Sequence, residues 1–138
     1  MKSFGICIGA STLSVVEGSK DGSGHIQTNP ILIEPHSGNP RDVLLRALRN
    51  LAITDDVKVA VTGRKLRKSV NLSSLSEPEA VETALYHMNG QVNNPDAIIS
   101  AGGENFLVYV LGKDGKICAV KTGNKCASGT GEFFVQQL

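Results

Sequence analysis

ICIGASTLSVVEGSKDG, residues 6–22, recurs later in the chain as ISAGGENFLVYVLGKDG, residues 99–115. Without a gap, the first glycine of each copy, the apolar positions after it and the closing Lys-Asp-Gly coincide. Each copy is typical of a short apolar strand, a glycine turn, a second apolar strand and an Asp-Gly turn into a third strand. The shared register indicates that a three-stranded unit is duplicated within the chain.

Between the two copies the apolar period changes from that of a strand to that of a helix. Residues 42–51 have the spacing of an amphipathic helix, and Pro40 lies near its start, where a missing N–H costs little. Residues 57–62 (VKVAVT) predict a strand closed by Gly63, and residues 70–75 predict another short strand.

A second helix is expected after these strands. Ser76 and Glu79 have the spacing of a capping box, which favours a helix that begins there and continues to Met88. Asn89-Gly90 would end that helix. The element order therefore predicts a mixed α/β fold, with a first lobe over residues 1–93 and the beginning of a similar second lobe over residues 94–138.

The last residues favour a further helix that starts near Glu132, yet the chain stops at Leu138. So short a helix cannot bury an apolar face by itself. We therefore expect the chain to be the N-terminal piece of a longer protein, truncated in the first helix of its second lobe.

Composition excludes little but points away from two classes of partner. Hydrophobic residues make up 41% of the chain and the net charge is +1, which gives no reason to expect nucleic acid or an anionic membrane surface. No segment approaches the ~20 apolar residues of a membrane span. Three cysteines without a CxxC pair, and no signal-peptide pattern, favour a reduced, cytoplasmic setting.

The glycine turns of the two copies are candidate anion sites. Small residues let backbone N–H groups approach a phosphate closely, and hydroxyl groups add donors. Two such turns facing one cleft would clamp a polyphosphate from both sides, whereas by itself each turn would simply reverse the chain. The Walker-type pattern Gly-x-x-x-x-Gly-Lys-Ser/Thr does not occur. The candidate residues are Gly9, Ala10, Ser11 and Thr12 in the first turn, and Gly102 and Gly103 in the second.

A third candidate lies near the end of the chain. N–H groups ahead of the expected last helix, with the helix dipole, favour an anion or a thiolate; they belong to Gly129, Thr130 and Gly131. Cys126 is three residues upstream and follows Lys125, an environment that lowers a thiol pKa and suits a metal or a cluster. The alternative is that Cys126 is an ordinary loop cysteine.

The remaining cysteines and the histidines are not expected to bind ligands. Cys7 and Cys118 lie in apolar strand patterns, so we expect both to be shielded from solvent. The three histidines show no ligand spacing and are assigned no role.

KCASGTG (residues 125–131), AGGE (residues 101–104) and the repeated glycine turns together resemble the activator ATPases of 2-hydroxyacyl-CoA dehydratases and benzoyl-CoA reductases. This BadF/BadG-type family belongs to the actin, sugar kinase and heat-shock ATPase superfamily. The resemblance extends from about Phe4 to Leu138. KCASGTG is its most specific element, since the glycine turns occur throughout the superfamily.

The resemblance implies two RNase H-like lobes that close around ATP and Mg²⁺. It also implies a homodimer that shares one 4Fe-4S cluster and delivers a low-potential electron to a CoA-substrate dehydratase or reductase component. Residues 9–12 and 102–104 would occupy the two phosphate-loop positions. Cys126 would occupy the first cluster-ligand position and would face its symmetry mate.

Two positions depart from the family pattern. Cys7 and Ser100 stand where the family carries aspartates that hold hydrated Mg²⁺ and orient the attacking water. Glu104 is then the remaining candidate catalytic carboxylate, and residues 1–138 by themselves are not expected to hydrolyse ATP. Two alternatives stay open: a degenerate, non-catalytic copy of the fold that serves as a scaffold or partner-binding module, and a small-molecule kinase relative, which would not need the Cys126 loop.

Overall fold

The computed structural model describes residues 1–63, 66–88, 95–102 and 106–123. The chain divides into two units, Met1–Glu77 and Pro78–Leu138, which are treated separately below. Within the described ranges, no helix is long and apolar enough to cross a lipid bilayer.

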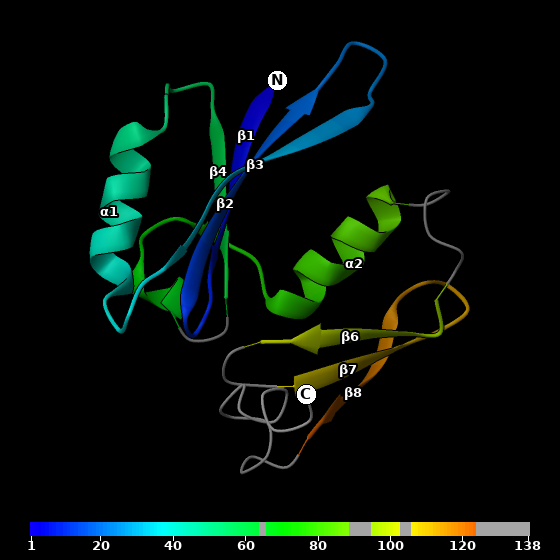
Figure 1. Cartoon of the computed structure of the whole chain (residues 1–138). Coiled ribbons are helices and arrows are strands. Elements are labelled where there is room, and N and C mark those ends of the chain that lie inside the picture. The colour runs from blue at the N-terminus through cyan, green and yellow to red at the C-terminus, as the bar shows by residue number, and fades with distance from the viewer. Residues whose placement is uncertain (64–65, 89–94, 103–105, 124–138) are drawn as a thin grey trace. The chain divides into compact units, whose positions relative to one another are not determined.

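The first unit contains a five-stranded mixed sheet in the order β3-β2-β1-β4-β5 (Figure 1). The first three strands form an antiparallel meander, and β4 and β5 run parallel to β1. The carboxyl ends of β1, β4 and β5 therefore meet at one edge of the sheet, an edge where α/β proteins commonly bind ligands. The strands are β1 (Lys2–Ile8), β2 (Thr12–Lys20), β3 (Ile26–Pro35), β4 (Lys58–Thr62) and β5 (Ser73–Ser74).

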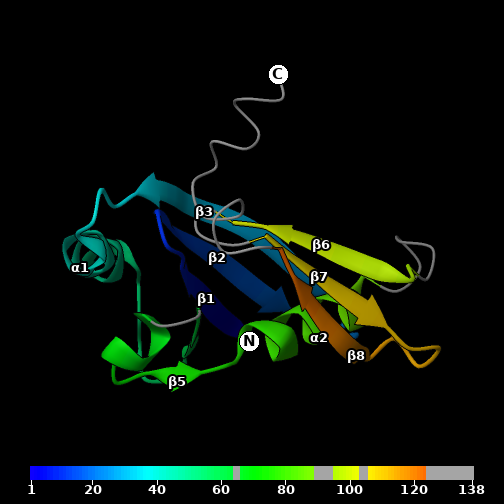
Figure 2. The same cartoon turned by 90° about the horizontal axis from the view of Figure 1, so that it is seen from below.

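Helix α1 (Pro40–Asn50) covers one face of this sheet (Figures 1 and 2). It starts as expected, with Pro40 in the first turn and the Asn39 Oδ1 atom accepting a hydrogen bond from the Asp42 N–H at 3.4 Å. Alternation along each strand sends every second side chain toward the helix, and burying such side chains is the main stabilising term. The buried core is formed by Phe4, Ile6, Ile8, Leu13, Val15, Val43, Leu44, Ala47 and Val61.

The second sheet is an antiparallel meander in the order β6-β7-β8, accompanied by helix α2 (Glu77–His87). Glu82 connects the helix to the sheet, because its Oε1 atom accepts a hydrogen bond from the Ile117 N–H at 2.7 Å. The strands are β6 (Ala97–Ala101), β7 (Phe106–Leu111) and β8 (Ile117–Thr122).

The registers of the two meanders agree with the duplication predicted from the sequence. Ile6 pairs with Val15 in the first unit, and their counterparts Ile99 and Val108 pair in the second. The two units nevertheless bury opposite faces of the repeated strands. Ile6 is 1% exposed, whereas Ile99 is 64% exposed. Where β2 carries serine, valine and glycine, β7 carries the buried Leu107, Tyr109 and Leu111, which turn the other face inward.

The expected mixed α/β class and the helices expected near Pro40 and Ser76 are confirmed, whereas the helix expected near Glu132 lies outside the described residues and stays a prediction. The strand expected over residues 70–75 is limited to Ser73–Ser74, and a short 3-10 helix, η1 (Leu66–Ser69), precedes it. The lobe boundary expected near residue 93 stays a prediction, because residues 89–94 lie outside the described residues.

Candidate functional site

The first glycine turn joins β1 to β2 at the edge where the parallel strands end. The Gly9 N–H donates to the Thr12 carbonyl oxygen at 2.9 Å, which closes the turn. Ala10, Ser11 and Thr12 are exposed, and the N–H groups of Ala10 and Ser11 have no acceptor among the residues that the structure describes. Two open N–H donors and two hydroxyl groups thus meet on one small exposed turn, as an anion site requires.

A buried histidine to which the sequence analysis assigned no role, His36, makes hydrogen bonds to the backbone of this turn. The His36 side chain is 5% exposed, and its Nε2 atom lies 3.2 Å from the Gly9 carbonyl oxygen. The His36 backbone N–H donates to the Ser11 carbonyl oxygen at 3.0 Å. Sequence reasoning missed His36 because ligand spacing was the wrong criterion: its position directly after β3 is the informative signal.

Cys7 is half-buried near the end of β1, beside Thr62 of the parallel strand β4. Burial raises the pKa of the Cys7 thiol above its ordinary value of 9.0, and the negative charge of Glu77 raises this pKa further. The thiol is therefore protonated at neutral pH and supplies no negative charge at this position. The neighbouring Thr62 hydroxyl oxygen is buried, without a hydrogen-bond partner in the described part of the chain.

Glu77 is the second residue at this edge that sequence reasoning missed. The Leu75 N–H donates to the Val61 carbonyl oxygen at 2.9 Å, so the chain that enters α2 is attached next to the end of β4. Glu77 follows two residues later, as the first residue of α2, and its charge acts on the Cys7 thiol. A carboxylate at a helix start is favoured by the helix dipole, which is the signal that its sequence position carried.

The second glycine turn is described only in part. Gly102 is exposed directly after β6, and Ser100 on that strand pairs with Leu107. The other predicted site residues lie outside the described residues and stay predictions: Gly103, Glu104, Cys126, Gly129, Thr130 and Gly131. Within the described ranges, no three His, Cys, Asp or Glu side chains are grouped to hold a metal ion.

The expectation that Cys118 is shielded is wrong. Its side chain is exposed, and its Sγ atom donates to the Val110 carbonyl oxygen at 3.4 Å. The physical reason is that, within the described residues, β8 is an edge strand that pairs with β7. Five of its six residues are exposed, and Ile117 is half-buried.

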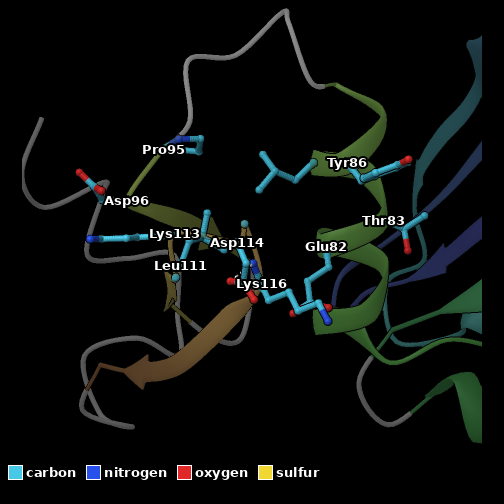
Figure 3. Close-up of a pocket in the computed structure, with 12 residues that line it drawn as sticks. Glu82, Thr83, Tyr86, Pro95, Asp96, Leu111, Lys113, Asp114 and Lys116 are labelled. Atoms are coloured by element: carbon cyan, nitrogen blue, oxygen red, sulfur yellow. Dashed lines mark hydrogen bonds between the residues drawn. The ribbon is translucent and has the colours of Figure 1, made fainter.

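A cavity of about 590 Å³ lies in the second unit, between α2 and the turn that joins β7 to β8 (Figure 3). Asp96 at its rim precedes β6 and Gly102 follows β6, so the cavity and the second glycine turn lie at opposite ends of this strand. Its lining contains both acidic and basic side chains, and the basic ones are not in the excess that would favour an anion. The lining residues are Glu82, Thr83, Leu85, Tyr86, Pro95, Asp96, Leu111, Gly112, Lys113, Asp114, Gly115 and Lys116.

The two described cysteines should differ in reactivity. At about pH 7.5, iodoacetamide should alkylate Cys118 well before Cys7, because the thiolate is the reactive form and Cys7 combines burial with a raised pKa. The raised pKa also links the Cys7 thiol to stability. The thiol of the unfolded chain loses its proton near pH 9.0, before the thiol of the folded chain does, so the free energy of unfolding is unaffected by Cys7 below that pH and falls as the pH rises above it.

Peptide mass spectrometry over a time course checks the order of alkylation. Urea unfolding of wild type and Cys7→Ser at increasing pH measures how the free energy of unfolding changes. The variant should lack the decrease that the Cys7 thiol causes above pH 9.0. Equal alkylation rates at the two cysteines of the folded protein would contradict the assignment.

Comparison with known proteins gives no matching family model. The chain is 28% identical over 138 residues to an uncharacterized protein of Methanocaldococcus jannaschii, and the match covers 98% of this chain and 54% of that protein. The chain thus spans about half the length of the curated relative that it matches.

Three solved structures share the fold. The activator of 2-hydroxyisocaproyl-CoA dehydratase from Clostridium difficile, with bound ADPNP, is 22% identical with a TM-score of 0.69, covering 100% of this chain and 53% of that chain. Component A of (R)-2-hydroxyglutaryl-CoA dehydratase from Acidaminococcus fermentans is 20% identical with a TM-score of 0.62, covering 98% and 52%. A Ppx/GppA family member from Aquifex aeolicus is 12% identical with a TM-score of 0.56, covering 99% and 54%. The described chain therefore has the mixed α/β fold of the actin-like ATPases.

Proposed function

We propose that this chain is the nucleotide-binding part of an activator-type ATPase, and that the turn at residues 9–12 holds the phosphates of ATP. The observation that carries the proposal is the pair of open N–H donors, Ala10 and Ser11, at the carboxyl edge of the parallel strands. The likeness to a dehydratase activator that was solved with ADPNP supports the same assignment.

In this proposal each residue of the turn has a defined task. The Ala10 and Ser11 N–H groups donate to phosphate oxygens, and the Ser11 and Thr12 hydroxyl groups add two more donors. Gly9 keeps the turn tight, since a Cβ atom there would lie 3.0 Å from the Thr12 carbonyl oxygen. Gly102 and Gly103 would supply the corresponding phosphate contacts from the second unit.

We propose that Glu77, together with Glu104, takes over from the aspartates that the family carries. The protonated Cys7 thiol is a poor ligand for Mg²⁺, a hard cation that prefers oxygen, whereas the Glu77 carboxylate fits it. Mg²⁺ would neutralise charge on the phosphates when bound. Glu77 would hold and orient the water that attacks the terminal phosphate.

The finer parts of the proposal concern the cluster and the partner. Cys126 would be a ligand of a 4Fe-4S cluster shared across a homodimer, and this cluster would supply one-electron transfer when bound. The partner would be a dehydratase or reductase component that acts on a CoA thioester. The names of two structures with this fold, which mention CoA-substrate dehydratases, support the dehydratase alternative. The proposed setting is the cytoplasm.

Ser11→Glu should weaken binding of the ATP analogue ADPNP to the full-length protein by about tenfold or more. The new carboxylate would stand among the proposed phosphate donors, and juxtaposed like charges cost several kcal/mol. Ser19→Glu is the matched control, because Ser19 is also exposed on this hairpin, at the far end of β2. Isothermal titration with Mg²⁺ and ADPNP measures both affinities; equal affinity in the two variants would refute the phosphate-binding assignment.

Cys126→Ala should abolish cluster incorporation during anaerobic iron-sulfur reconstitution of the full-length protein, because a lost thiolate ligand leaves one iron without its protein ligand. Iron and sulfide content is the measurement. Cys118→Ala, which removes a thiol that is exposed on β8, should retain the cluster. Equal cluster content in wild type and Cys126→Ala, or none in either, would eliminate the proposed ligand.

A further inference from the structure

His36 makes hydrogen bonds through both ring nitrogen atoms and through its backbone N–H and carbonyl groups. Its side chain is polar and only 5% exposed. Its Nε2 atom is 3.2 Å from the Gly9 carbonyl oxygen, and its Nδ1 atom accepts from the Gly38 N–H at 3.2 Å. Its own backbone donates to the Ser11 carbonyl oxygen and accepts from the Asn39 N–H.

These contacts assign the state of the ring. Nδ1 accepts a hydrogen bond from the Gly38 N–H and therefore carries no proton. Nε2 faces a carbonyl oxygen, which only accepts, so Nε2 carries the proton and donates to Gly9. Both nitrogen atoms of the ring are therefore engaged in hydrogen bonds.

The bond from His36 to Gly9 replaces one that a tight hairpin would otherwise make. In a two-residue hairpin the residues that flank the loop usually exchange two hydrogen bonds. Here the Gly9 N–H donates to the Thr12 oxygen, but the described contacts include no return bond from the Thr12 N–H to the Gly9 oxygen. That oxygen instead turns inward to His36.

The direction of the Gly9 carbonyl fixes the direction of the next N–H. The Gly9 carbonyl and the Ala10 N–H belong to the same trans peptide plane and point in opposite directions. By holding the Gly9 oxygen inward, His36 therefore aims the Ala10 N–H outward, toward the exposed side of the turn.

The segment after β3 is shaped to hold the imidazole in place. Ser37 and Gly38 both have left-handed backbone conformations, with φ of 45° and 84°, and this bend brings the Gly38 N–H onto Nδ1. Asn39 then caps α1. The ring is thereby attached to the start of a helix that is itself packed on the core, so its position is well defined.

We infer that His36 is a positioning residue for phosphate binding, which keeps the turn at residues 9–12 open with the Ala10 N–H aimed at the ligand. The inference rests on the proposed function for its ligand, while the orientation of the turn is testable without one. No contact between the imidazole and the nucleotide is required.

Two conservative variants separate the two ring contacts. The side-chain amide of His36→Gln places an N–H donor near the former Nε2 atom, and the side-chain oxygen of His36→Asn places an acceptor near the former Nδ1 atom. We expect ADPNP affinity to stay within about threefold of wild type in His36→Gln, and to fall about tenfold in His36→Asn and His36→Ala, because these two lose the bond to Gly9. A purely structural role would instead make affinity follow the melting temperature of each variant.

A second readout needs no nucleotide. The Ala10 amide resonance of the ligand-free full-length protein should be close to wild type in His36→Gln and displaced in His36→Asn. If the wild type binds no ADPNP, the proposed function fails, and the Ala10 resonance still tests the inference. If ADPNP binds but the affinity and the Ala10 resonance are the same in all variants, or if His36→Asn retains both and His36→Gln loses both, the inference is overturned and the proposed function stands.

Discussion

Gly63→Ala should lower the melting temperature of the protein by more than about 15 °C. A Cβ atom at this position would lie 2.2 Å from the Ile8 carbonyl oxygen and 3.0 Å from its carbon, closer than packed atoms come. Gly63 also has a φ of 118°, a backbone conformation that residues other than glycine rarely adopt. The clash and the strained backbone together cost about 3 kcal/mol or more, and each kcal/mol corresponds to about 4–8 °C in a unit of this size.

The clash has no inexpensive relief, because both contacting atoms are backbone. Ile8 ends β1 and Gly63 directly follows β4, so relief requires the two central parallel strands to separate at the edge that carries the candidate site. Gly115→Ala is the matched control: Gly115 also has a positive φ, of 74°, but no neighbouring atom lies within 4 Å of the position that a Cβ atom would take there. That variant should lose about 1 kcal/mol from backbone strain alone. Thermal unfolding followed by circular dichroism compares the two, and equal small losses would show that the β1–β4 contact tolerates a methyl group.

Glu77→Gln should reduce ATP turnover of the full-length protein by about a hundredfold or more, with ADPNP affinity nearly unchanged. The reason is that a carboxylate that orients and deprotonates the attacking water contributes to the transition state and little to nucleotide binding. Glutamine keeps the shape of the side chain but neither the charge nor the basicity. Phosphate release under saturating Mg²⁺ and ATP measures the effect.

The same variant has a second consequence that does not depend on catalysis. Because the Glu77 charge helps to raise the pKa of the Cys7 thiol, its removal should lower that pKa and accelerate Cys7 alkylation. Glu79→Gln, at an exposed position on the same helix, should change neither turnover nor alkylation. Faster alkylation with unchanged turnover would leave Glu77 beside Cys7 but remove it from the proposed mechanism.

The repeat allowed most of the fold to be predicted. Gly9 and Gly102, with their apolar flanks, give the order of the strands and their pairing register, because alternation of period two fixes which residues can lie opposite one another. The helix signals at Pro40 and Ser76 locate α1 and α2 for a similar reason, since caps and apolar spacing are local features.

What the sequence did not predict depends on contacts between distant segments. β5 consists of two serines that form a strand because β4 offers a free edge, so no apolar pattern marks it. Burial in the second sheet does not follow from the local strand pattern, because Ile99 has the same strand pattern as Ile6 with the opposite burial. Cys118 was misjudged because its apolar pattern does not show that β8 is an edge strand of the described sheet.

The candidate site also combines residues that the local sequence predicts with residues that contacts between distant segments bring together. The turn at residues 9–12 was identified because its small and hydroxyl residues are contiguous in the sequence. His36 follows β3 and Glu77 follows β5, so the arrangement of the strands in the sheet brings both residues to this edge. Neither residue belongs to a spacing motif. Identifying them required knowing that the carboxyl ends of β1, β4 and β5 meet.

Phosphate binding at the first glycine turn can be observed directly in an amide-resonance titration of the full-length protein with Mg²⁺ and ADPNP. If the turn at residues 9–12 binds the phosphates, the Ala10 and Ser11 amide resonances should move with the same dissociation constant that calorimetry gives. Adenosine, which has no phosphate, should leave them in place, and the Ser19 amide should stay unchanged throughout. Binding of ADPNP without movement of the Ala10 and Ser11 resonances, or no binding at all, would contradict the assignment of this turn as the phosphate site.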